Sequence, residues 1–326
     1  MKVAVIGAGA WGTALALVLH RGGRSVRIWG HNPAHLDEMR RTARNERYLP
    51  GIDLPKDWDY VPELRQAAAG ADVVVMAVPS KALRVVAEGL ADPAGILVSV
   101  TKGIEHDTGL TMCGVLRQCA PRAQVAALTG PSLALEVARE IPTAIVAASE
   151  NAAAARTVQE LFHGPRFRVY TSSDLIGAEM GGALKNVVAL AAGIGDGLGF
   201  GDNSKASLLT RGIVEIRRLG VKCGAQPETF AGLSGLGDLT VTCFSKLSRN
   251  RTLGERLGRG ERLADILAAS VTVAEGYPTA RSAWQLARKL RVTTPILDEV
   301  YQLLYEGKNV AQALQDLVGR DSRAED

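Results

Sequence analysis

The chain has 326 residues, a length that suggests about two domains, each large enough to bury a core without disulfides or metals. Its content of 47% hydrophobic and 22% charged residues excludes the composition of a disordered protein. Aromatic residues make up only 5%, and the net charge of +4 includes no long run of like charges. A nucleic-acid-binding surface built on stacking rings is therefore disfavoured.

The cysteines and histidines predict neither disulfides nor a metal site. Four cysteines occur without a CxxC pair, and His31 and His35, although one helical turn apart, have no further ligands nearby. Apart from the glycine-interrupted N-terminal segment, no apolar run approaches the ~18 residues of a membrane span. We therefore expect a cytoplasmic protein with no metal, no membrane contact and no nucleic-acid partner.

Short, β-branched apolar runs recur through the first half of the chain. Such runs are typical of buried parallel strands, and helical periodicity fills the intervals between them. This alternation predicts an α/β domain with a doubly wound, Rossmann-like and mostly parallel sheet. The expected strands are residues 3–7, 26–30, 71–78, 95–100, 124–130, 143–149 and 166–172, and the expected helices are 12–20, 81–90, 109–120 and 152–161.

The second half has a different pattern. The strand pattern stops near residue 174, and helical periodicity continues, which predicts an all-α domain. The expected helices are residues 178–192, 205–219, 263–269, 280–290 and 296–305. We therefore divide the chain into a dinucleotide-binding domain, residues 1–176, and a helical substrate domain, residues 177–326, with the ligand site between them.

A glycine-rich loop follows the first predicted strand directly. Gly7, Gly9 and Gly12 form a GxGxxG motif between this strand and a helix, which is the context that makes the motif specific for dinucleotides. The first glycine permits a tight turn, the second gives the pyrophosphate access, and the third allows close helix packing. The N–H groups of Ala10 and Trp11 are then free to face a phosphate.

The end of the second predicted strand bears on the choice between NAD and NADP. An acidic residue there would bind the ribose 2′-hydroxyl and repel a 2′-phosphate, but the sequence reads Trp-Gly-His-Asn at residues 29–32. NADP is therefore not excluded. Two interpretations of His31 remain open, contact with the adenosine ribose or its phosphate, and a cap on the turn before Pro33.

Lys185 interrupts an otherwise apolar helix. A lysine in such a helix could extend its ammonium group to solvent. Its neighbours are small and apolar on every side, however, so little solvent-exposed surface is available to the ammonium group. A lysine held in a partly desolvated site has a lowered pKa and can exchange a proton near neutral pH, so we favour a catalytic role. Gly181 and Gly182 would permit close approach of another backbone or a ligand.

Three further groups of polar residues fit an anionic ligand. Together they contain backbone N–H donors, a lysine, and an arginine that can contact phosphate with two N–H groups. Taken singly, each group could also serve only as an ordinary loop or helix cap. Two of the groups follow predicted strands at the carboxyl edge of the sheet, where ligands of such folds bind. The groups are residues 130–132, residues 101–103, and Ser245 with residues 248–250.

The ordered motifs resemble those of bacterial-type NAD(P)-dependent sn-glycerol-3-phosphate dehydrogenases over nearly the whole chain. They read GAGAWGTALA at 7–16, NERYLPG at 45–51, AVPS at 77–80, TKGIE at 101–105, GPSLALEV at 130–137, GGALKN at 181–186, GLGDLTVTC at 235–243, SRN at 248–250 and AEG at 274–276. One departure is Leu133, where this family pattern predicts an aromatic residue.

The resemblance implies a role for individual residues. It implies that Lys185 is the proton acceptor for the C2 hydroxyl and that Lys102 touches both substrate and cofactor. The other implied substrate contacts are Gly130, Ser132, Asp238, Ser248, Arg249 and Asn250. The implied contacts with the NAD(P)H cofactor are Ala10, Trp11, His31, Ala134, Arg249, Val273 and Glu275, and among these Ala134, Val273 and Glu275 rest on the resemblance alone.

The implied reaction is reversible hydride transfer between NAD(P)H and dihydroxyacetone phosphate, a small phosphorylated triose, giving sn-glycerol 3-phosphate for phospholipid synthesis. Lys185 would supply the proton, while Lys102 and other donors would stabilise the developing oxyanion. A homodimer is implied as well. Two alternatives remain, a 3-hydroxyacid dehydrogenase of similar plan and a non-catalytic nucleotide-binding redox sensor.

Overall fold

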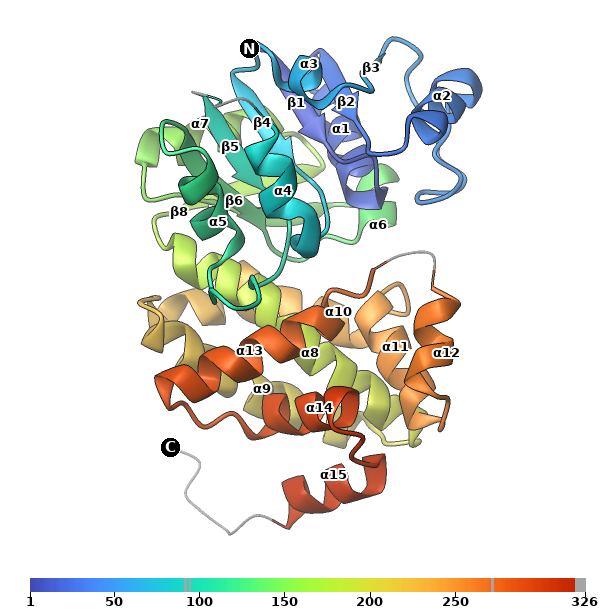
Figure 1. Cartoon of the computed structure of the whole chain (residues 1–326), viewed down its shortest axis with the longest axis vertical. Coiled ribbons are helices and arrows are strands. Elements are labelled where there is room, and N and C mark those ends of the chain that lie inside the picture. Colours follow the sequence, from blue (N-terminus) through green and yellow to red (C-terminus); the bar gives the residue numbers. More distant parts are fainter. Residues whose placement is uncertain (91–92, 94, 271–272, 320–326) are drawn as a thin grey trace.

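The computed structural model describes residues 1–90, 93, 95–270 and 273–319, and it shows two halves in direct contact. Figure 1 places the sheet half above and the helical half below, with the last described helix at the end of the molecule farthest from the sheet. The doubly wound sheet followed by an all-helical region, which the sequence predicts, is confirmed.

The sheet has eight strands in the order β3-β2-β1-β4-β5-β6-β7-β8. Every neighbouring pair is parallel except β6 and β7, which are antiparallel. The strands are β1 (Val3–Ile6), β2 (Val26–Trp29), β3 (Asp59–Tyr60), β4 (Val73–Met76), β5 (Ile96–Ser99), β6 (Gln124–Thr129), β7 (Thr143–Ala148) and β8 (Phe167–Ser172). The sequence did not predict β3, because two residues are too few to show a period.

The central strands are buried on both faces, which explains why they have no polar face, whereas the outer strands β2 and β8 leave alternate residues at least partly exposed. In β1, Val3 and Val5 contribute to one apolar core, while Ala4 and Ile6 contribute to the core on the other face. The helices of this half are α1 (Ala10–Arg21), α2 (Pro33–Thr42), α3 (Leu64–Ala68), α4 (Leu83–Glu88), α5 (Met112–Cys119), α6 (Ala134–Ala138) and α7 (Ala152–Phe162), with a 3₁₀ turn, η1 (Ser80–Ala82), before α4.

The helical half is built around α8 (Leu175–Gly197), most of whose residues are buried. It contacts α9, α10, α11, α13 and α14, so it forms the central rod of this half. The surrounding elements are α9 (Asp202–Lys222), η2 (Pro227–Ala231), η3 (Leu233–Gly237), α10 (Asp238–Phe244), α11 (Arg249–Gly258), α12 (Leu263–Ala268), α13 (Gly276–Leu290), α14 (Pro295–Tyr305) and α15 (Val310–Val318).

Glycines let α8 and α11 cross at close range. A Cβ added to Gly193 would lie 2.0 Å from the carbonyl oxygen of Arg251, and one added to Gly254 would lie 2.1 Å from that of Leu190. Neither position accepts a larger residue without movement of backbone. This crossing fixes the N-terminal end of α11, which carries the SRN motif, against the middle of α8.

The sequence did not predict α10, α11 and α15. The first two lie in a segment rich in glycine, serine and arginine, where turn-forming residues mask the helical period. Strand β8 ends at Ser172 and α8 begins at Leu175, close to the expected division at residues 176 and 177. That division stays a prediction, and its last residues, 320–326, lie outside the described chain.

One described helix, α8, is long and apolar enough to cross a membrane by length and composition. However, 89% of its most apolar stretch is buried inside the protein. The protein fold itself therefore accounts for the apolar character of this helix.

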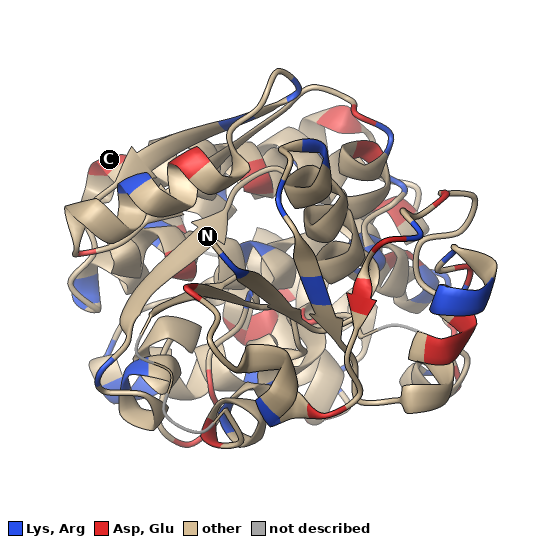
Figure 2. Ribbon diagram, turned by 90° about the horizontal axis from the view of Figure 1, so that it is seen from above, with Lys and Arg blue, Asp and Glu red and all other residues tan. Residues whose placement is uncertain are grey.

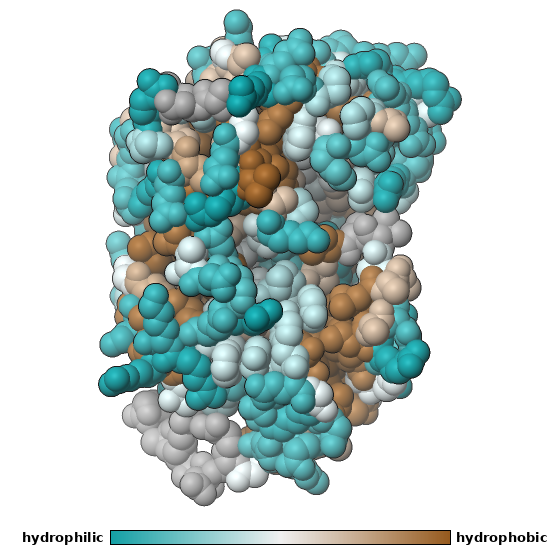
Figure 3. All heavy atoms as spheres, viewed as in Figure 1, coloured by the Kyte–Doolittle hydropathy of each residue, from teal (hydrophilic) through white to brown (hydrophobic). Residues whose placement is uncertain are grey.

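The surface carries charges of both signs. In the view of Figure 2, basic and acidic residues are interspersed around the periphery rather than gathered by sign. Figure 3 shows a mostly hydrophilic face on which hydrophobic patches interrupt both halves. No stripe of a single sign is therefore visible in Figure 2.

Candidate active site

The site forms where the carboxyl ends of the central strands meet the helical half. The segments that follow β1, β4, β5 and β6 are Gly7–Gly9, Ala77–Ser80, Thr101–Gly103 and Gly130–Ser132. Because these strands are parallel and adjacent, the segments gather at one edge of the sheet.

The glycine-rich loop has the geometry that its sequence predicts. Gly7 has φ +128°, and a Cβ there would lie 2.3 Å from the carbonyl oxygen of Ala77. A Cβ at Gly12 would lie 1.9 Å from the carbonyl oxygen of Gly7, so only glycine lets α1 start this close to the turn. A Cβ at Gly9, in contrast, would meet nothing within 4 Å. The space above Gly9 thus fits the approach of a phosphate.

Two polar groups are buried at this loop, the Asn45 amide and the Trp11 indole N–H. Asn45, in the NERYLPG motif, donates from Nδ2 to the Ala8 carbonyl oxygen at 3.0 Å and to Thr13 Oγ1 at 2.8 Å. These bonds tie Asn45 to the turn although it lies 37 residues beyond Ala8 in the sequence, a role that the sequence did not reveal. The indole N–H of Trp11 is buried without a partner among the described residues, so it fits an acceptor supplied by a ligand.

His31 is exposed just after β2, and it does not cap the following helix. The cap of α2 is Asn32, whose Oδ1 accepts from the backbone N–H of His35 at 3.3 Å. The interpretation of His31 as a turn cap is therefore wrong, while ribose contact stays a prediction. His35 is buried against Tyr48, and burial lowers the pKa of its imidazole.

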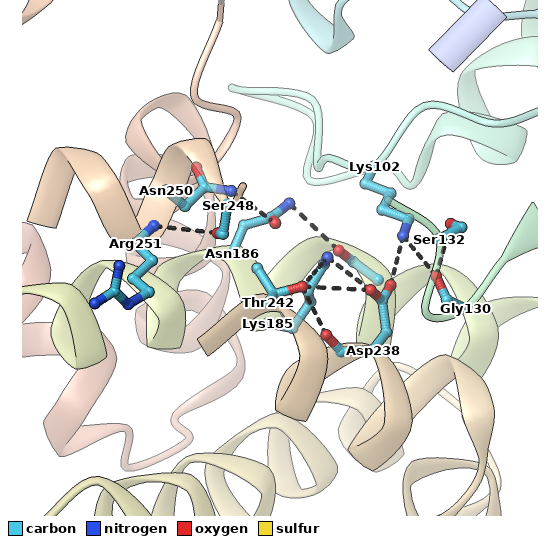
Figure 4. Close-up of polar contacts among 11 residues, drawn as sticks. Lys102, Gly130, Ser132, Lys185, Asn186, Asp238, Thr242, Ser248, Asn250 and Arg251 are labelled. Carbon is cyan, nitrogen blue, oxygen red and sulfur yellow. Dashed lines mark hydrogen bonds and ion pairs between the residues drawn. The ribbon is translucent and has the colours of Figure 1, made fainter. Parts of the chain in front are cut away.

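Two lysine ammonium groups bind opposite oxygens of one buried carboxylate (Figure 4). Lys185 Nζ lies 2.7 Å from Asp238 Oδ1, and Lys102 Nζ lies 2.5 Å from Asp238 Oδ2. Lys102 follows β5, whereas Lys185 and Asp238 come from α8 and α10, so the two halves meet at this carboxylate. The side chain of Asp238 is 1% exposed, that of Lys185 8% and that of Lys102 17%.

Adjacent glycines in α8 explain how these groups come together. A Cβ at Gly181 would lie 2.4 Å from the Ser234 carbonyl oxygen in η3, the π-helical turn that leads into Asp238. A Cβ at Gly182 would lie 2.7 Å from Thr129 Oγ1 and 3.6 Å from Lys102 Cγ. The pair thus admits a backbone on one side and the Lys102 side chain on the other, as the sequence predicts.

Burial lowers the pKa of Lys185 from its usual value near 10.5 to about 8. Desolvation is the largest cause, Asp238 opposes it, and the positive charge of Lys102 adds to the lowering. The alternative in which this lysine extends to solvent is wrong, since only 6% of the residue is exposed. A lysine with this pKa can both give and take a proton near neutral pH.

Thr242 orients the Lys185 ammonium group. Its hydroxyl accepts from Lys185 Nζ at 2.5 Å and donates to the Asp238 carbonyl oxygen at 2.6 Å, one helical turn back. Lys185 has three N–H donors, and Asp238 and Thr242 take two of them. One N–H therefore remains for an oxygen of a ligand. Nothing in the sequence singles out Thr242, because threonine at this helical spacing is common.

The SRN motif forms the N-terminal end of α11. Ser248 Oγ accepts from the Arg251 N–H at 3.2 Å and so caps the helix, while Asn250 donates to Asn186 Oδ1 at 2.9 Å. Asn250 Oδ1 in turn accepts from the Gly276 N–H at 2.8 Å. Both ends of the Asn250 amide are therefore engaged, which leaves one N–H for a ligand.

Arg249 is exposed at the start of α11 and lines a cavity of about 280 Å³. The protein around its guanidinium group lowers the pKa by desolvation, and Glu275 opposes this effect. Arginine remains protonated under such conditions. The side chain is thus a permanent cation that solvent, and hence a ligand, can reach.

The remaining predicted residues lie at the junction of the two halves. Lys102 Nζ and Ser132 Oγ both donate to the Gly130 carbonyl oxygen, at 3.1 and 2.9 Å. Glu275 accepts from the Ser80 N–H at 3.0 Å and from Ser80 Oγ at 2.5 Å, which joins α13 to the segment after β4. Ala134, at the start of α6, and Val273, before α13, are half-buried.

Thr129 completes the polar surroundings of the lysines. Its hydroxyl is buried without a partner among the described residues, next to Gly182 and the Lys102 stem. Within the described ranges, no three His, Cys, Asp or Glu side chains are placed to hold a metal ion. The expectation that no metal takes part stays a prediction.

Comparison with known proteins finds a family match in each half of the chain. Residues 2–155 match the family described as NAD-dependent glycerol-3-phosphate dehydrogenase N-terminus, and residues 174–315 match the corresponding C-terminus. Two proteins named glycerol-3-phosphate dehydrogenase (NAD(P)+) are similar over 99% of this chain and 98% of their own length. That of Geobacter metallireducens is 52% identical, and that of Geobacter sulfurreducens is 50% identical. The crystal structure of glycerol-3-phosphate dehydrogenase from Coxiella burnetii is similar with a TM-score of 0.94 and 38% identity, covering 98% of this chain and 99% of that one.

Proposed function

The chain belongs to the NAD-dependent glycerol-3-phosphate dehydrogenase family, and on that premise we propose how its residues perform the family's reaction. The reaction is reversible hydride transfer between NAD(P)H and dihydroxyacetone phosphate, which yields sn-glycerol 3-phosphate for phospholipid synthesis. The observation that carries the residue assignment is the buried carboxylate of Asp238 with a lysine ammonium group on each oxygen.

Lys185 is the proton donor in the reductive direction. Two of its N–H groups are held by Asp238 and Thr242, so the third points to the substrate oxygen that becomes the hydroxyl. Its pKa of about 8 favours release of this proton to an alkoxide, which is a far stronger base. In the oxidative direction the neutral amine takes the proton back from the C2 hydroxyl.

Lys102 stabilises the negative charge that develops on the same oxygen. The Gly130 carbonyl and Asp238 hold two of its N–H groups, so the ammonium position is fixed before the substrate arrives. Asp238 neutralises one of the two lysine charges and keeps them together in a site that excludes most water. The net positive charge that remains suits an anionic substrate.

The phosphate of the substrate is bound by Arg249, with Ser248, Asn250, Gly130 and Ser132 as further contacts. Arg249 is a reachable cation that can meet a phosphate with two parallel N–H groups. The free N–H of Asn250 and the N-terminal end of α11 beside it favour negative charge as well.

The GxGxxG loop holds the pyrophosphate of NAD(P)H through Gly7, Gly9, Gly12 and the N–H groups of Ala10 and Trp11. The open space above Gly9 and the unpartnered Trp11 indole support this assignment. When bound, the nicotinamide ring supplies or accepts the hydride. The further proposed cofactor contacts are His31, Lys102, Ala134, Arg249, Val273 and Glu275.

The test of this proposal is NAD(P)H oxidation measured with dihydroxyacetone phosphate, unphosphorylated dihydroxyacetone and a panel of 3-oxoacids. We expect turnover with dihydroxyacetone phosphate and little with the others. Preferential turnover of a 3-oxoacid would favour the hydroxyacid dehydrogenase, and cofactor binding without any turnover would favour the redox sensor.

Two further expectations concern the protein in the cell. We propose that it works in the cytoplasm, where NAD(P)H and phosphorylated trioses occur, and that it is a homodimer. Size measurement of the purified chain tests the second expectation.

A further inference from the structure

The loop that carries Lys102 contacts both halves of the protein. This loop, residues 101–111 between β5 and α5, is called the Lys102 loop below. Although it belongs to the sheet half, its Ile104 is buried in the apolar core of the helical half, together with Met180 of α8. A Cβ added to Gly109 would lie 3.2 Å from Leu286 Cδ1 in α13, so the far end of the loop also lies against the helical half. The conformation of this loop therefore decides where Lys102 lies relative to the helical half.

Glu105 links the same loop to the sheet half. Arg84 of α4 donates to both of its carboxylate oxygens, from Nε at 2.8 Å and from Nη2 at 2.7 Å. The two side chains are only 30% and 20% exposed, so water competes weakly for this pair of parallel bonds. Gln118 Oε1 in α5 accepts from the same Nη2 at 2.9 Å, which fixes the guanidinium group from another side. Arg84 is thus a rigid attachment point for the Lys102 loop.

Glu105 also organises the loop internally. Thr108 Oγ1 donates to Glu105 Oε2 at 2.7 Å, and the Glu105 N–H donates to the Leu110 carbonyl oxygen at 2.8 Å. The Gly109 N–H in turn donates to the Glu105 carbonyl oxygen at 3.1 Å. The hydrogen bonds from Arg84 hold the pKa of the Glu105 carboxyl below its usual value, so this group stays ionised at neutral pH. Both the backbone and the side chain of Glu105 therefore keep the loop in one conformation.

Lys102 lies three residues before Glu105 and depends on that conformation. Its Nζ reaches Asp238 Oδ2 at 2.5 Å and the Gly130 carbonyl oxygen at 3.1 Å (Figure 4). Because lysine carries its charge on a flexible four-carbon stem, these bonds form together only when the backbone beneath the stem is correctly placed. A misplacement of ~1 Å in an active site can cost about 100-fold in rate. The attachment of the loop at Glu105 is thus a requirement for the position of the Lys102 ammonium group.

We propose that Arg84 and Glu105 are positioning residues, which hold the Lys102 loop so that the Lys102 ammonium group shares the Asp238 carboxylate with Lys185. The pair acts through the loop, because Arg84 lies on α4 and bonds to Glu105, Gln118 and the Cys119 sulfur rather than to the lysines. The effect on the rate rests on the proposed function. The effect on the position of Lys102 does not, and it can be measured without turnover.

A displaced Lys102 would change the electrostatics at Lys185. The charged and titratable groups that act on Lys185 are Asp238, Lys102 and Cys243. The positive charge of Lys102 lowers the pKa of Lys185, so a Lys102 that moves away from Asp238 should let this pKa rise above about 8. A substitution that only lowers stability would leave the same groups around Lys185 in the folded molecules. The pH profile of kcat therefore separates a positioning role from a purely structural one.

The test compares Arg84→Met and Glu105→Gln with the wild type and with Arg27→Met. Arg27 is the matched control, because its side chain is 31% exposed and pairs with Asp59, but it lies on β2, which β1 and β4 separate from β5. In Arg84→Met and Glu105→Gln, kcat for the reduction should fall about 10- to 100-fold, and the pH at which it falls should move upward. The double variant should lose no more than the more affected single variant, because both substitutions break the same contact. Arg27→Met should keep the rate and the pH profile of the wild type.

A second measurement follows Lys102 directly. The Lys102 side chain is 17% exposed and two of its N–H groups are bonded, so brief treatment of the folded full-length protein with acetic anhydride should acetylate it slowly in the wild type and in Arg27→Met. Peptide mass spectrometry should show several-fold faster acetylation of Lys102 in Arg84→Met and Glu105→Gln. Glu105→Gln keeps the size of the side chain, so it remains a test if Arg84→Met does not fold.

The two measurements have distinct outcomes. Acetylation of Lys102 at the wild-type rate in the folded variants would overturn the proposal, whatever happens to turnover. So would a fall in kcat with an unchanged pH profile, because the loss would then not arise from the position of Lys102. A wild type without turnover would refute the proposed function instead, and the acetylation rates would still decide whether Arg84 and Glu105 position Lys102.

Discussion

Replacing Lys185 with methionine separates proton transfer from packing. Methionine keeps most of the length and apolar volume of the lysine stem and deletes the ammonium group. In the structure this removes one N–H from Asp238 Oδ1 and one from Thr242, while Lys102 stays on Asp238 Oδ2. The carboxylate therefore keeps one cation, and the site does not acquire an unpaired buried charge.

The expected effect on stability is small because two contributions oppose each other. Losing a partner of a buried acceptor costs about 1–3 kcal/mol. The lowered pKa of Lys185 means that burying its positive charge costs roughly 3 kcal/mol at neutral pH, and the variant is free of that cost. The rate, in contrast, should fall about 10²- to 10⁴-fold, the usual contribution of a general acid, which is about 3–5 kcal/mol in the barrier.

The assay is single-turnover hydride transfer by folded, cofactor-saturated Lys185→Met, with NAD(P)H binding measured separately. Lys308→Met is the matched control, because Lys308 also forms a largely buried ion pair in the helical half, with Glu299, but lies between α14 and α15, at the end of this half farthest from the sheet. The control should react at the wild-type rate. If Lys185→Met also did so, Lys185 would have no part in proton transfer and Lys102 would be the next candidate.

The pH dependence of the wild type gives a second check on the same reasoning. Reduction needs protonated Lys185, so its kcat should fall as the pH rises through about 8. Oxidation needs the neutral amine, so its kcat should rise through the same value. Both transitions should disappear in Lys185→Met, and a transition that persists there would belong to another group.

Three further predictions concern the cofactor, the phosphate and the fold. Because no acidic residue follows Trp29 at the end of β2, kcat/KM with NADPH should lie within ~10-fold of that with NADH, and a preference for NADH of several hundredfold would refute this. Arg249→Ala should abolish the advantage of dihydroxyacetone phosphate over dihydroxyacetone, with only partial recovery in Arg249→Lys, and unchanged discrimination would argue against the phosphate assignment. Gly181→Ala would place its Cβ 2.4 Å from the Ser234 carbonyl oxygen and should lower stability by about 1–3 kcal/mol in thermal unfolding. Gly164→Ala, whose Cβ would meet nothing within 4 Å, should leave Tm unchanged, and equal effects of the two would contradict this explanation.

Local chemistry made much of the fold and of the candidate site predictable. A strand buried on both faces must be apolar throughout, so the central strands β1, β4, β5, β6 and β7 were visible as continuous runs, whereas the two residues of β3 were not. The glycine-rich loop was predictable because its requirements are local, a positive φ at Gly7 and absent Cβ atoms at Gly9 and Gly12. Lys185 was identifiable as a candidate because its apolar helical neighbours leave no path for its ammonium group to reach solvent.

The sequence by itself indicated the candidate reactive groups, such as Lys185, but the tertiary structure decided what each one contacts. Asp238 lies 53 residues from Lys185 and 136 from Lys102, and Glu275 lies 195 residues from Ser80. Such contacts depend on how the helices cross and on which backbone packs against a glycine, as the backbone of Ser234 packs against Gly181. The lowered pKa of Lys185 likewise arises from burial by residues distant in sequence. Spacing along the chain reports only on neighbours within a turn or two, so contacts and electrostatics of this kind exist only once the chain is folded.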